Sequence, residues 1–313
     1  MLETKVKKLI DEKAKDLNSQ ENIAECVSCI IRRLNEFIDE DITLKDDEIK
    51  SYLDQLIGYF TTTLYLPLLP ELKIMRARVF EEAYRASDVN ELSYIPEAKK
   101  ACVTLGRLNL AEEPIYYGCI YFNESWGGVN VALSEVNAKP MQTVNILRSE
   151  VTEDKELNVC FIGIYDLIFR EAKPYFMTED VFSYFKDVYG YQQEKYTENV
   201  FLAHQLCDAF FLDILRRREH GNLYRVTSRL AGMFLEGDEV DGVVYTSVKA
   251  EGSPVIALKT TAVDSKLCHK KAESFLVKKD YGYALYNALL TAGGEINSSE
   301  STIVWKKQTT NKL

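Results

Sequence analysis

Residues 114–122 read Pro-Ile-Tyr-Tyr-Gly-Cys-Ile-Tyr-Phe, an almost unbroken run of apolar and aromatic side chains. Such a run is typical of a strand that is buried on both faces. Alternation of apolar and polar residues predicts further strands at residues 73–80, 142–151, 158–165, 241–248, 254–259 and 301–306. Helical patterns stand in blocks of their own and do not alternate regularly with these strands. The sequence therefore predicts an α+β fold.

The N-terminal part of the chain is helical by its pattern. Apolar side chains recur at helical spacing in residues 2–17, 23–38 and 49–60. Asp46 or Asp47 is expected to cap the third helix, and two prolines near residue 70 stop helix propagation. We therefore expect a small helical domain at residues 1–68, followed by a second domain at residues 69–313.

Helical patterns return within the second domain. The predicted helices cover residues 129–136, 178–189, 197–217 and 224–235. Thr178 and Thr197 are expected N-caps, and Gly190 is expected to end the helix that Thr178 begins. Three basic residues, 216–218, suit a helix C-terminus.

Composition argues against several classes of protein. The formal net charge is −10, so a nucleic-acid backbone is not expected as the ligand. The clusters Lys270-Lys271 and Lys278-Lys279 are interpreted as a solvated helix face or edge. No apolar run is long enough to span a bilayer. Residues 1–5 lead into a charged helical pattern and not into the apolar core of a signal peptide. Seven scattered cysteines do not form a disulfide framework, so we expect a cytoplasmic protein that does not bind membranes.

Common catalytic and cofactor motifs are missing from the sequence. It contains no GxGxxG fingerprint, no GxxxxGK[ST] phosphate loop and no GxSxG nucleophile elbow. The three histidines lack the spacing of metal ligands. Cys26 and Cys29 form a CxxC without a second ligand pair, and we interpret them as two small apolar residues on a helix.

Several polar residues lie within strand and turn patterns. Arg76 and Arg78 share one face of their predicted strand, where paired guanidiniums could bind a pyrophosphate or a carboxylate. Glu135 lies beside the apolar stripe of its helix, and Ser247 ends a predicted strand. Each of them also has an ordinary interpretation: a solvent-facing arginine pair, a solvated glutamate, and a serine that bonds to the backbone.

The order of these pieces resembles the RES-domain family, named for its Arg, Glu and Ser. The matching motifs are Arg76 in an early strand, the turn Gly106-Arg107-Leu108-Asn109, the strand Pro114-Ile115-Tyr116-Tyr117-Gly118, the helix Ala132-Leu133-Ser134-Glu135-Val136 and the late strand Asp241-Gly242-Val243-Val244-Tyr245-Thr246-Ser247. The resemblance covers residues 73–259. Thr246 and Leu108 stand where the family often has proline and an aromatic residue, and the helical N-terminus is extra.

The resemblance implies a fold similar to the ADP-ribosyltransferase toxins, with a mixed β core and flanking helices. It also implies an enzyme that consumes NAD as substrate, by hydrolysis or phosphorolysis, without a cofactor or metal. By position, Arg76 would bind the pyrophosphate or ribose side, Glu135 would lie near the nicotinamide ribose, and Ser247 would orient the nicotinamide. Further candidates for substrate binding are Arg78, Arg107, Tyr116, Tyr117 and Tyr245.

Other interpretations stay open at this point. One is ADP-ribosyl transfer to a protein or a small molecule, and another is a regulatory module that binds a nucleotide without turnover. Because a free NAD-degrading enzyme would poison its host, as toxins of toxin–antitoxin pairs do, we expect an antitoxin or regulatory protein to act through the N-terminal helices. The sequence leaves homo-oligomerisation open.

Overall fold

The computed structural model describes residues 3–60, 65–68, 72–81, 83–121, 126–174, 177–250, 252–297 and 300–307. The chain forms two compact units. The helical unit comprises Met1–Tyr65, Leu105–Leu110 and Cys160–Phe234, and the sheet unit comprises Leu66–Thr104, Ala111–Val159 and Leu235–Leu313. The chain thus leaves the helical unit near the boundary expected at residue 68. However, the helical unit is larger than residues 1–68, because it also includes the later helices that we assigned to the second domain.

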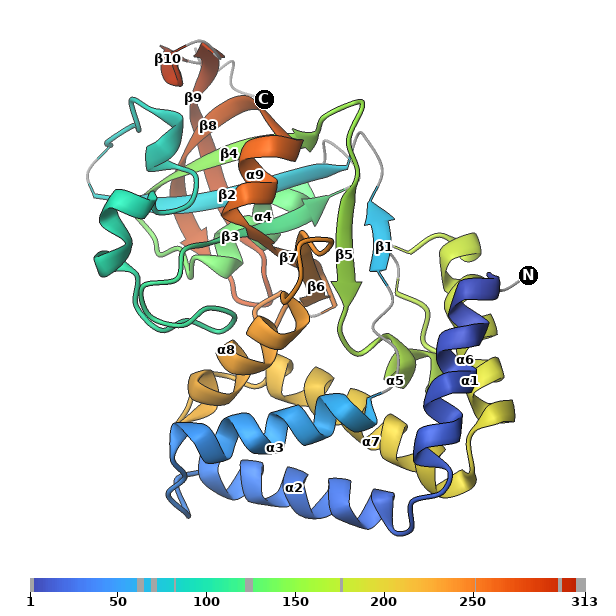
Figure 1. Ribbon diagram of the computed structural model, residues 1–313. Coiled ribbons are helices and arrows are strands. Elements are labelled where there is room, and N and C mark those ends of the chain that lie inside the picture. Colours follow the sequence, from blue (N-terminus) through green and yellow to red (C-terminus); the bar gives the residue numbers. More distant parts are fainter. Residues whose placement is uncertain are drawn as a thin grey trace. The chain divides into compact units, whose positions relative to one another are not determined.

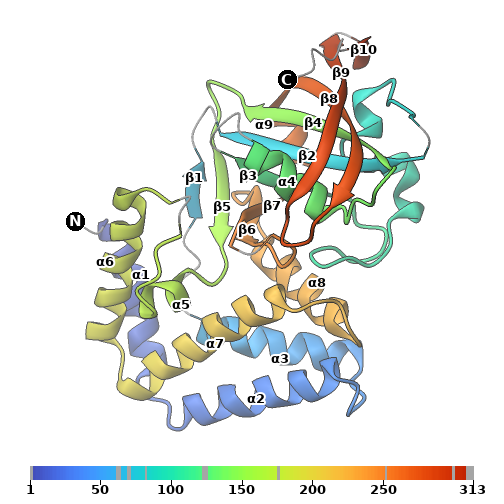
Figure 2. The ribbon, with the colours of Figure 1, turned by 180° about the vertical axis from the view of Figure 1, so that it is seen from behind.

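The helical unit is built from amphipathic helices that bury their apolar faces on one another. Its helices are α1 (Thr4–Leu17), α2 (Ile23–Ile38), α3 (Asp46–Tyr59), α5 (Ile164–Phe169), α6 (Glu179–Lys195), α7 (Glu198–Arg216) and α8 (Leu223–Phe234). Helix α2 packs on α3 and α7, and α1 packs on α6, as Figures 1 and 2 show. The stripe on α2 that the sequence analysis identified buries Val27, Ile30 and Leu34.

The helix caps follow the sequence with one exception. Thr178 and Thr197 accept hydrogen bonds from backbone N–H groups three residues later, as predicted. Helix α3 instead begins at Asp46, with Lys45 at the N-cap position. There the Glu48 carboxylate accepts the Lys45 N–H at 2.8 Å, so the cap bond comes from within the first turn.

Two predicted ends were wrong. Helix α6 continues through Gly190 to Lys195, and its last turns bury Gln192. Burial in that part of the helix outweighs the cost of about 1 kcal/mol for a glycine in a helix interior. The strand expected at 158–165 ends at Phe161, and the chain turns into α5 because Gly163 adopts a left-handed φ of 85°.

The sheet unit contains one curved sheet, and the α+β class predicted from the sequence is confirmed. Its strands are β1 (Tyr65–Leu68), β2 (Lys73–Phe80), β3 (Ile115–Tyr121), β4 (Thr143–Val151), β5 (Leu157–Phe161), β6 (Gly242–Thr246), β7 (Pro254–Lys259), β8 (Leu267–Asp280), β9 (Tyr286–Asn297) and β10 (Thr302–Lys307). They lie in the order β1-β5-β6-β7-β3-β2-β4-β8-β9-β10 (Figure 1). From β6 to β10 every neighbouring pair is antiparallel. Strand β3, the run quoted first above, lies near the middle.

The sequence analysis missed the long hairpin of β8 and β9. It interpreted Lys270-Lys271 and Lys278-Lys279 as a solvated helix face or edge, whereas both pairs lie in β8. This interpretation was wrong, because β8 pairs with β4 on one side and with β9 on the other. The strand buries Ala272 and Val277 between its charged residues, and register shifts interrupt its alternation. These bulges hide the period of two by which a strand is recognised.

The two faces of the sheet are covered by different elements. Helix α4 (Trp126–Glu135) packs on β2 and β3, and α9 (Thr260–Lys266) covers the opposite face, as the views of Figures 1 and 2 show. Gly128 permits the contact of α4, because a Cβ there would lie 2.9 Å from the Cβ of Tyr121. The segment that contains the 3-10 helices η1 (Val89–Glu91) and η2 (Glu97–Cys102) follows β2 along the chain.

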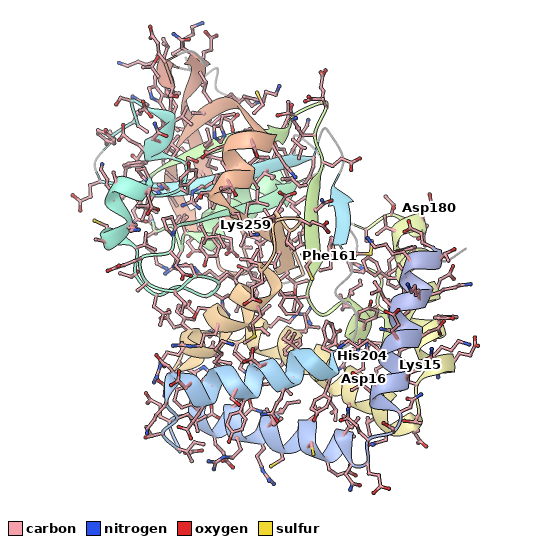
Figure 3. The ribbon with its side chains drawn as sticks, viewed as in Figure 1. Lys15, Asp16, Phe161, Asp180, His204 and Lys259 are labelled. Atoms are coloured by element: carbon pink, nitrogen blue, oxygen red, sulfur yellow. The ribbon has the colours of Figure 1, made fainter. Side chains whose placement is uncertain are left out.

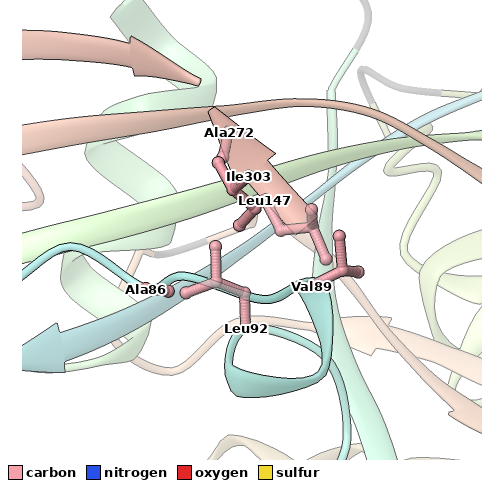
Figure 4. Packing of buried hydrophobic residues seen from close by; sticks show 6 residues of the cluster. All are labelled: Ala86, Val89, Leu92, Leu147, Ala272 and Ile303. Carbon is pink, nitrogen blue, oxygen red and sulfur yellow. The ribbon is translucent and has the colours of Figure 1, made fainter. Parts of the chain in front are cut away.

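This segment covers part of the α9 face through an apolar cluster. The cluster comprises Ala86, Val89, Leu92, Leu147, Ala272 and Ile303 (Figure 4). Leu147 in β4 pairs with Ala272 in β8 on one side and with Arg76 in β2 on the other. The cluster therefore fixes the backbone of residues 86–93 against the strand that carries Arg76.

Candidate functional site

Glu135 and Ser247 lie in direct contact in the sheet unit. The hydroxyl of Ser247 donates a short hydrogen bond to Oε1 of Glu135 across 112 residues of sequence. Glu135 is the last residue of α4, and Ser247 follows the end of β6. Two of the three residues named by the resemblance thus form one polar contact.

A tight turn after β6 holds Ser247 in place. Its Oγ accepts the backbone N–H of Lys249 at 3.0 Å and that of Ala250 at 2.8 Å. With both acceptor positions used, the hydroxyl proton is left for the Glu135 carboxylate. The ammonium of Lys249 also bonds to the backbone carbonyl of Glu135 at 2.6 Å, where it satisfies the C-terminal end of α4. The turn therefore fixes both the backbone and the carboxylate of Glu135.

The second carboxylate oxygen of Glu135 remains available. Oε2 makes no hydrogen bond to a residue that the structure describes, and the side chain is only partly buried. A carboxylate held through one oxygen presents the other in a fixed direction. This arrangement suits a group that must stabilise a positive charge on a bound molecule.

Arg76 lies where strands β2 and β3 separate. The ladder between them runs from Lys73 to Met75 and stops, although β2 continues. The Arg76 guanidinium enters there: Nη1 donates to the carbonyl of Tyr117 at 2.7 Å, and Nε donates to the carbonyls of Leu92 and Ser93 at 3.1 Å. Nη2 makes no hydrogen bond within the described part of the chain.

Arg78 joins Arg76 on the same face of β2, as strand alternation predicted. Its Nη2 donates to the carbonyl of Ser93 at 2.8 Å, the same oxygen that Arg76 contacts. No carboxylate among the described residues forms an ion pair with either guanidinium. The nearby Ser93 hydroxyl is buried and makes no hydrogen bond to a residue that the structure describes. Two partly buried cations without an ion-pair partner are a marked feature, although the charge of Glu91 lies within electrostatic reach of Arg78.

Electrostatics show how closely these groups lie. Burial, with the like charge of Arg78, lowers the pKa of Arg76 to about 10, so this side chain is still a cation at neutral pH. Burial raises the pKa of the Cys119 thiol well above its usual value, Glu135 raises it further, and Arg76 opposes the shift. Cys119, in β3, therefore lies within electrostatic reach of both charged groups.

The structure does not place Arg76 in contact with Glu135 or Ser247. Met75 pairs with Cys119, so by alternation Arg76 and Cys119 point to opposite sides of the sheet. Helix α4 and Glu135 lie on the side of Met75 and Tyr121.

The tyrosines proposed for substrate binding have different surroundings. Tyr116 is 0% exposed, and its ring lies beneath the Arg76 guanidinium at 5.2 Å. In this position it supports Arg76, and its role in substrate binding stays a prediction. Tyr117 points to the opposite side of β3 and is partly exposed, whereas Tyr245 is buried in β6.

Arg107 has a structural role in the helical unit. Its guanidinium donates to the carbonyls of Leu215 and Arg217 at 3.0 Å each and stacks on the ring of Tyr224. These carbonyls lie at the C-terminal end of α7, which Arg107 therefore caps. Both terminal nitrogens are used by the helix end, and the role of Arg107 in substrate binding stays a prediction. The Gly106–Asn109 stretch forms a turn, with the Gly106 N–H bonded to the Asn109 carbonyl.

The sequence analysis did not identify three residues near the site. Ser93 lies in an irregular segment, Cys119 stands inside an apolar strand, and Lys249 is one of many surface lysines in the composition. Only the contacts of the fold give them a role. Lys249 alone had a weak clue, since it follows Ser247 by two residues.

Among the described residues no group of three or more His, Cys, Asp or Glu side chains could hold a metal ion. Within the same part of the chain no helix has the length and apolar character needed to cross a membrane. Comparisons with family models, curated proteins and solved structures found no match for this chain.

Proposed function

We propose that this protein is an enzyme that cleaves the bond between nicotinamide and ribose in NAD. The observation that carries the proposal is the contact between Glu135 and Ser247, which holds one carboxylate oxygen and leaves the other available. The resemblance to the RES-domain family and to its ADP-ribosyltransferase-like fold supports the same assignment.

The chemistry fits the groups at hand. As the bond between ribose and nicotinamide breaks, positive charge develops on the ribose, and a fixed carboxylate stabilises that charge. Nicotinamide is cationic in NAD and leaves as a neutral molecule, so it needs no general acid. Glu135 would therefore act by charge, and Ser247 would position it. This mechanism needs no histidine and no metal.

Arg76 and Arg78 would bind the pyrophosphate of NAD. NAD carries two negative charges on its pyrophosphate, and Arg76 and Arg78 converge on one carbonyl without a carboxylate partner. An incoming pyrophosphate would provide a directly bonded counter-charge, whereas Glu91 acts on Arg78 without forming an ion pair. The structure favours Arg76 and Arg78 for this role over Arg107, whose guanidinium caps α7.

The test is an NAD-turnover assay with identified products. Wild-type protein should release nicotinamide and form ADP-ribose with water, or a phosphorylated ADP-ribose when inorganic phosphate attacks instead. Glu135→Gln should stop the release, whereas Glu156→Gln, at an exposed position in the sheet unit, should not change it. A wild-type protein that leaves NAD intact with and without phosphate would contradict the proposal.

Two other outcomes of the assay would redirect the assignment. ADP-ribose attached to an added protein or small molecule would identify a transferase. A rise in melting temperature with NAD but no product would indicate a module that only binds the nucleotide.

A further inference from the structure

The CxxC of helix α2 has surroundings that differ from its sequence interpretation. Cys26 and Cys29 are both exposed, whereas small apolar residues on a helix would be buried. The buried face of α2 is formed by neighbouring residues such as Val27 and Ile30. Cysteine is among the most buried residue types, so two exposed thiols three residues apart are unusual.

Helix geometry determines what these two thiols can do together. Side chains at i and i+3 have Cβ atoms about 5–6 Å apart on one side of a helix. A disulfide needs Cβ atoms about 3.5–4.5 Å apart, so oxidation would distort the helix. A single metal ion between two sulfurs, with bonds of about 2.3 Å such as zinc forms to thiolates, bridges a wider spacing than an S–S bond does.

We propose that Cys26 and Cys29 bind one soft monovalent cation of the Cu(I) class. Thiolates select soft ions, and a linear site needs only two of them. Zinc would need four ligands, and the described residues offer no group of three or more His, Cys, Asp or Glu in metal-binding arrangement.

The charge around the pair supports an anionic complex. Both thiols give up their protons when the ion binds, so Cu⁺ and two thiols yield a bis-thiolate of net charge −1 and two protons in solution, without any redox change. Arg32, one turn further along, donates from Nη2 to Sγ of Cys29 at 3.7 Å. Its positive charge offsets that of the complex.

The test is competition for Cu(I) under anaerobic, reducing conditions, against a coloured Cu(I) chelator. The full-length wild-type protein should withdraw one equivalent of Cu(I) from the chelator. Cys29→Ser should lose at least ten-fold in affinity, because one thiolate cannot chelate. Cys102→Ser should match the wild type, since Cys102 is exposed and has no second cysteine three residues away in the sequence.

A spacing variant separates a chelate from two independent thiols. Ser28 is also exposed, so Ser28→Cys with Cys29→Ser keeps the number of exposed thiols but places them at i and i+2, on different sides of the helix. This variant should lose the tight equivalent and keep a wild-type circular-dichroism spectrum. Wild-type affinity in the spacing variant, or loss of the equivalent in Cys102→Ser, would overturn the proposal.

Discussion

The hydroxyl of Ser247 donates its proton to the carboxylate of Glu135, although the two residues stand 112 positions apart. The same oxygen accepts two backbone N–H groups from the turn that follows β6. The serine therefore sets the direction of the carboxylate and fixes its own position at the same time. On this basis the two residues should affect turnover to different extents.

Ser247→Ala should lower kcat for NAD about 10- to 100-fold and leave measurable activity. The variant removes one hydrogen bond to a charged group, worth about 1.5–3 kcal/mol, but keeps the carboxylate. The check is a comparison of kcat with that of Glu135→Gln, which should be inactive. Ser265→Ala is the control, because that serine bonds only to its own helix. Equal loss in Ser247→Ala and Glu135→Gln would contradict a positioning role.

Arg78→Lys should raise the KM for NAD about ten-fold while leaving the melting temperature almost unchanged. Arg78 makes one described hydrogen bond, so most of its donors remain for a ligand. Arg76→Lys should raise KM and also lower the melting temperature, because Arg76 bonds to three carbonyls and stacks on Tyr116. Steady-state kinetics with NAD and thermal unfolding measure the two effects. Lys155→Gln, at an exposed position, is the charge control.

Arg107→Ala should destabilise the protein by about 2–4 kcal/mol without changing KM for NAD. The variant removes two hydrogen bonds from a charged donor to the carbonyls at the end of α7. Denaturant unfolding gives the free energy, and kinetics well below the melting temperature give KM. A raised KM in a folded Arg107→Ala protein would restore the substrate-binding role that the structure argues against.

The pH dependence of stability should depend on Asp208 in α7. Asp208 is 0% exposed and accepts the Asp166 N–H at 2.6 Å, and burial raises the pKa of its carboxyl to about 7. In the unfolded chain the pKa is about 3.9, so between these values the unfolded state is ionised while the folded state keeps its proton. The contribution of Asp208 is fully present below pH 4 and is lost as pH rises through 7.

Asp208→Asn should therefore remove this part of the pH dependence. The free energy of unfolding of the wild type should fall relative to that of the variant from about pH 4 to about pH 7. Above pH 7 the difference should stay constant. Burial lowers the pKa of His204, labelled in Figure 3, to about 3, so its protonation in the unfolded chain also changes stability in this range. This contribution is common to the wild type and Asp208→Asn and cancels in their difference. Asp16→Asn, at an exposed position on α1, is the control (Figure 3). Parallel curves for Asp208→Asn and the wild type would contradict this account.

Much of the fold follows from local pattern. Strand β3 is long, apolar and bounded by polar residues, and its predicted range matched the structure within one residue at each end. Thr178 and Thr197 correctly predicted the N-termini of α6 and α7, because a threonine N-cap bonds to a backbone N–H only three residues away. The β8–β9 hairpin was missed because bulges and lysines interrupt its period. The division into units was only partly predicted, since the packing of α2 on α7 is a tertiary property.

The candidate site, like the fold, was only partly predictable from the sequence. Glu135 and Ser247 were identified from the sequence motifs in which they stand. No local pattern could predict that their side chains would form a hydrogen bond. Arg76 and Arg78 were equivalent by strand alternation, and only the carbonyls of Leu92 and Tyr117, which Arg76 alone contacts, distinguish them. Arg107 looked equally suitable in sequence, because the helix end that it caps lies more than 100 residues away.

The most direct test of the central claim is release of nicotinamide from NAD by the purified protein, followed by chromatography with and without inorganic phosphate. Candidate partner proteins should be left out at first and then added back. We predict nicotinamide release by the wild type and by Glu156→Gln, and none by Glu135→Gln of equal melting temperature. Equal release by Glu135→Gln and the wild type, or no release by any of the three, would contradict the account.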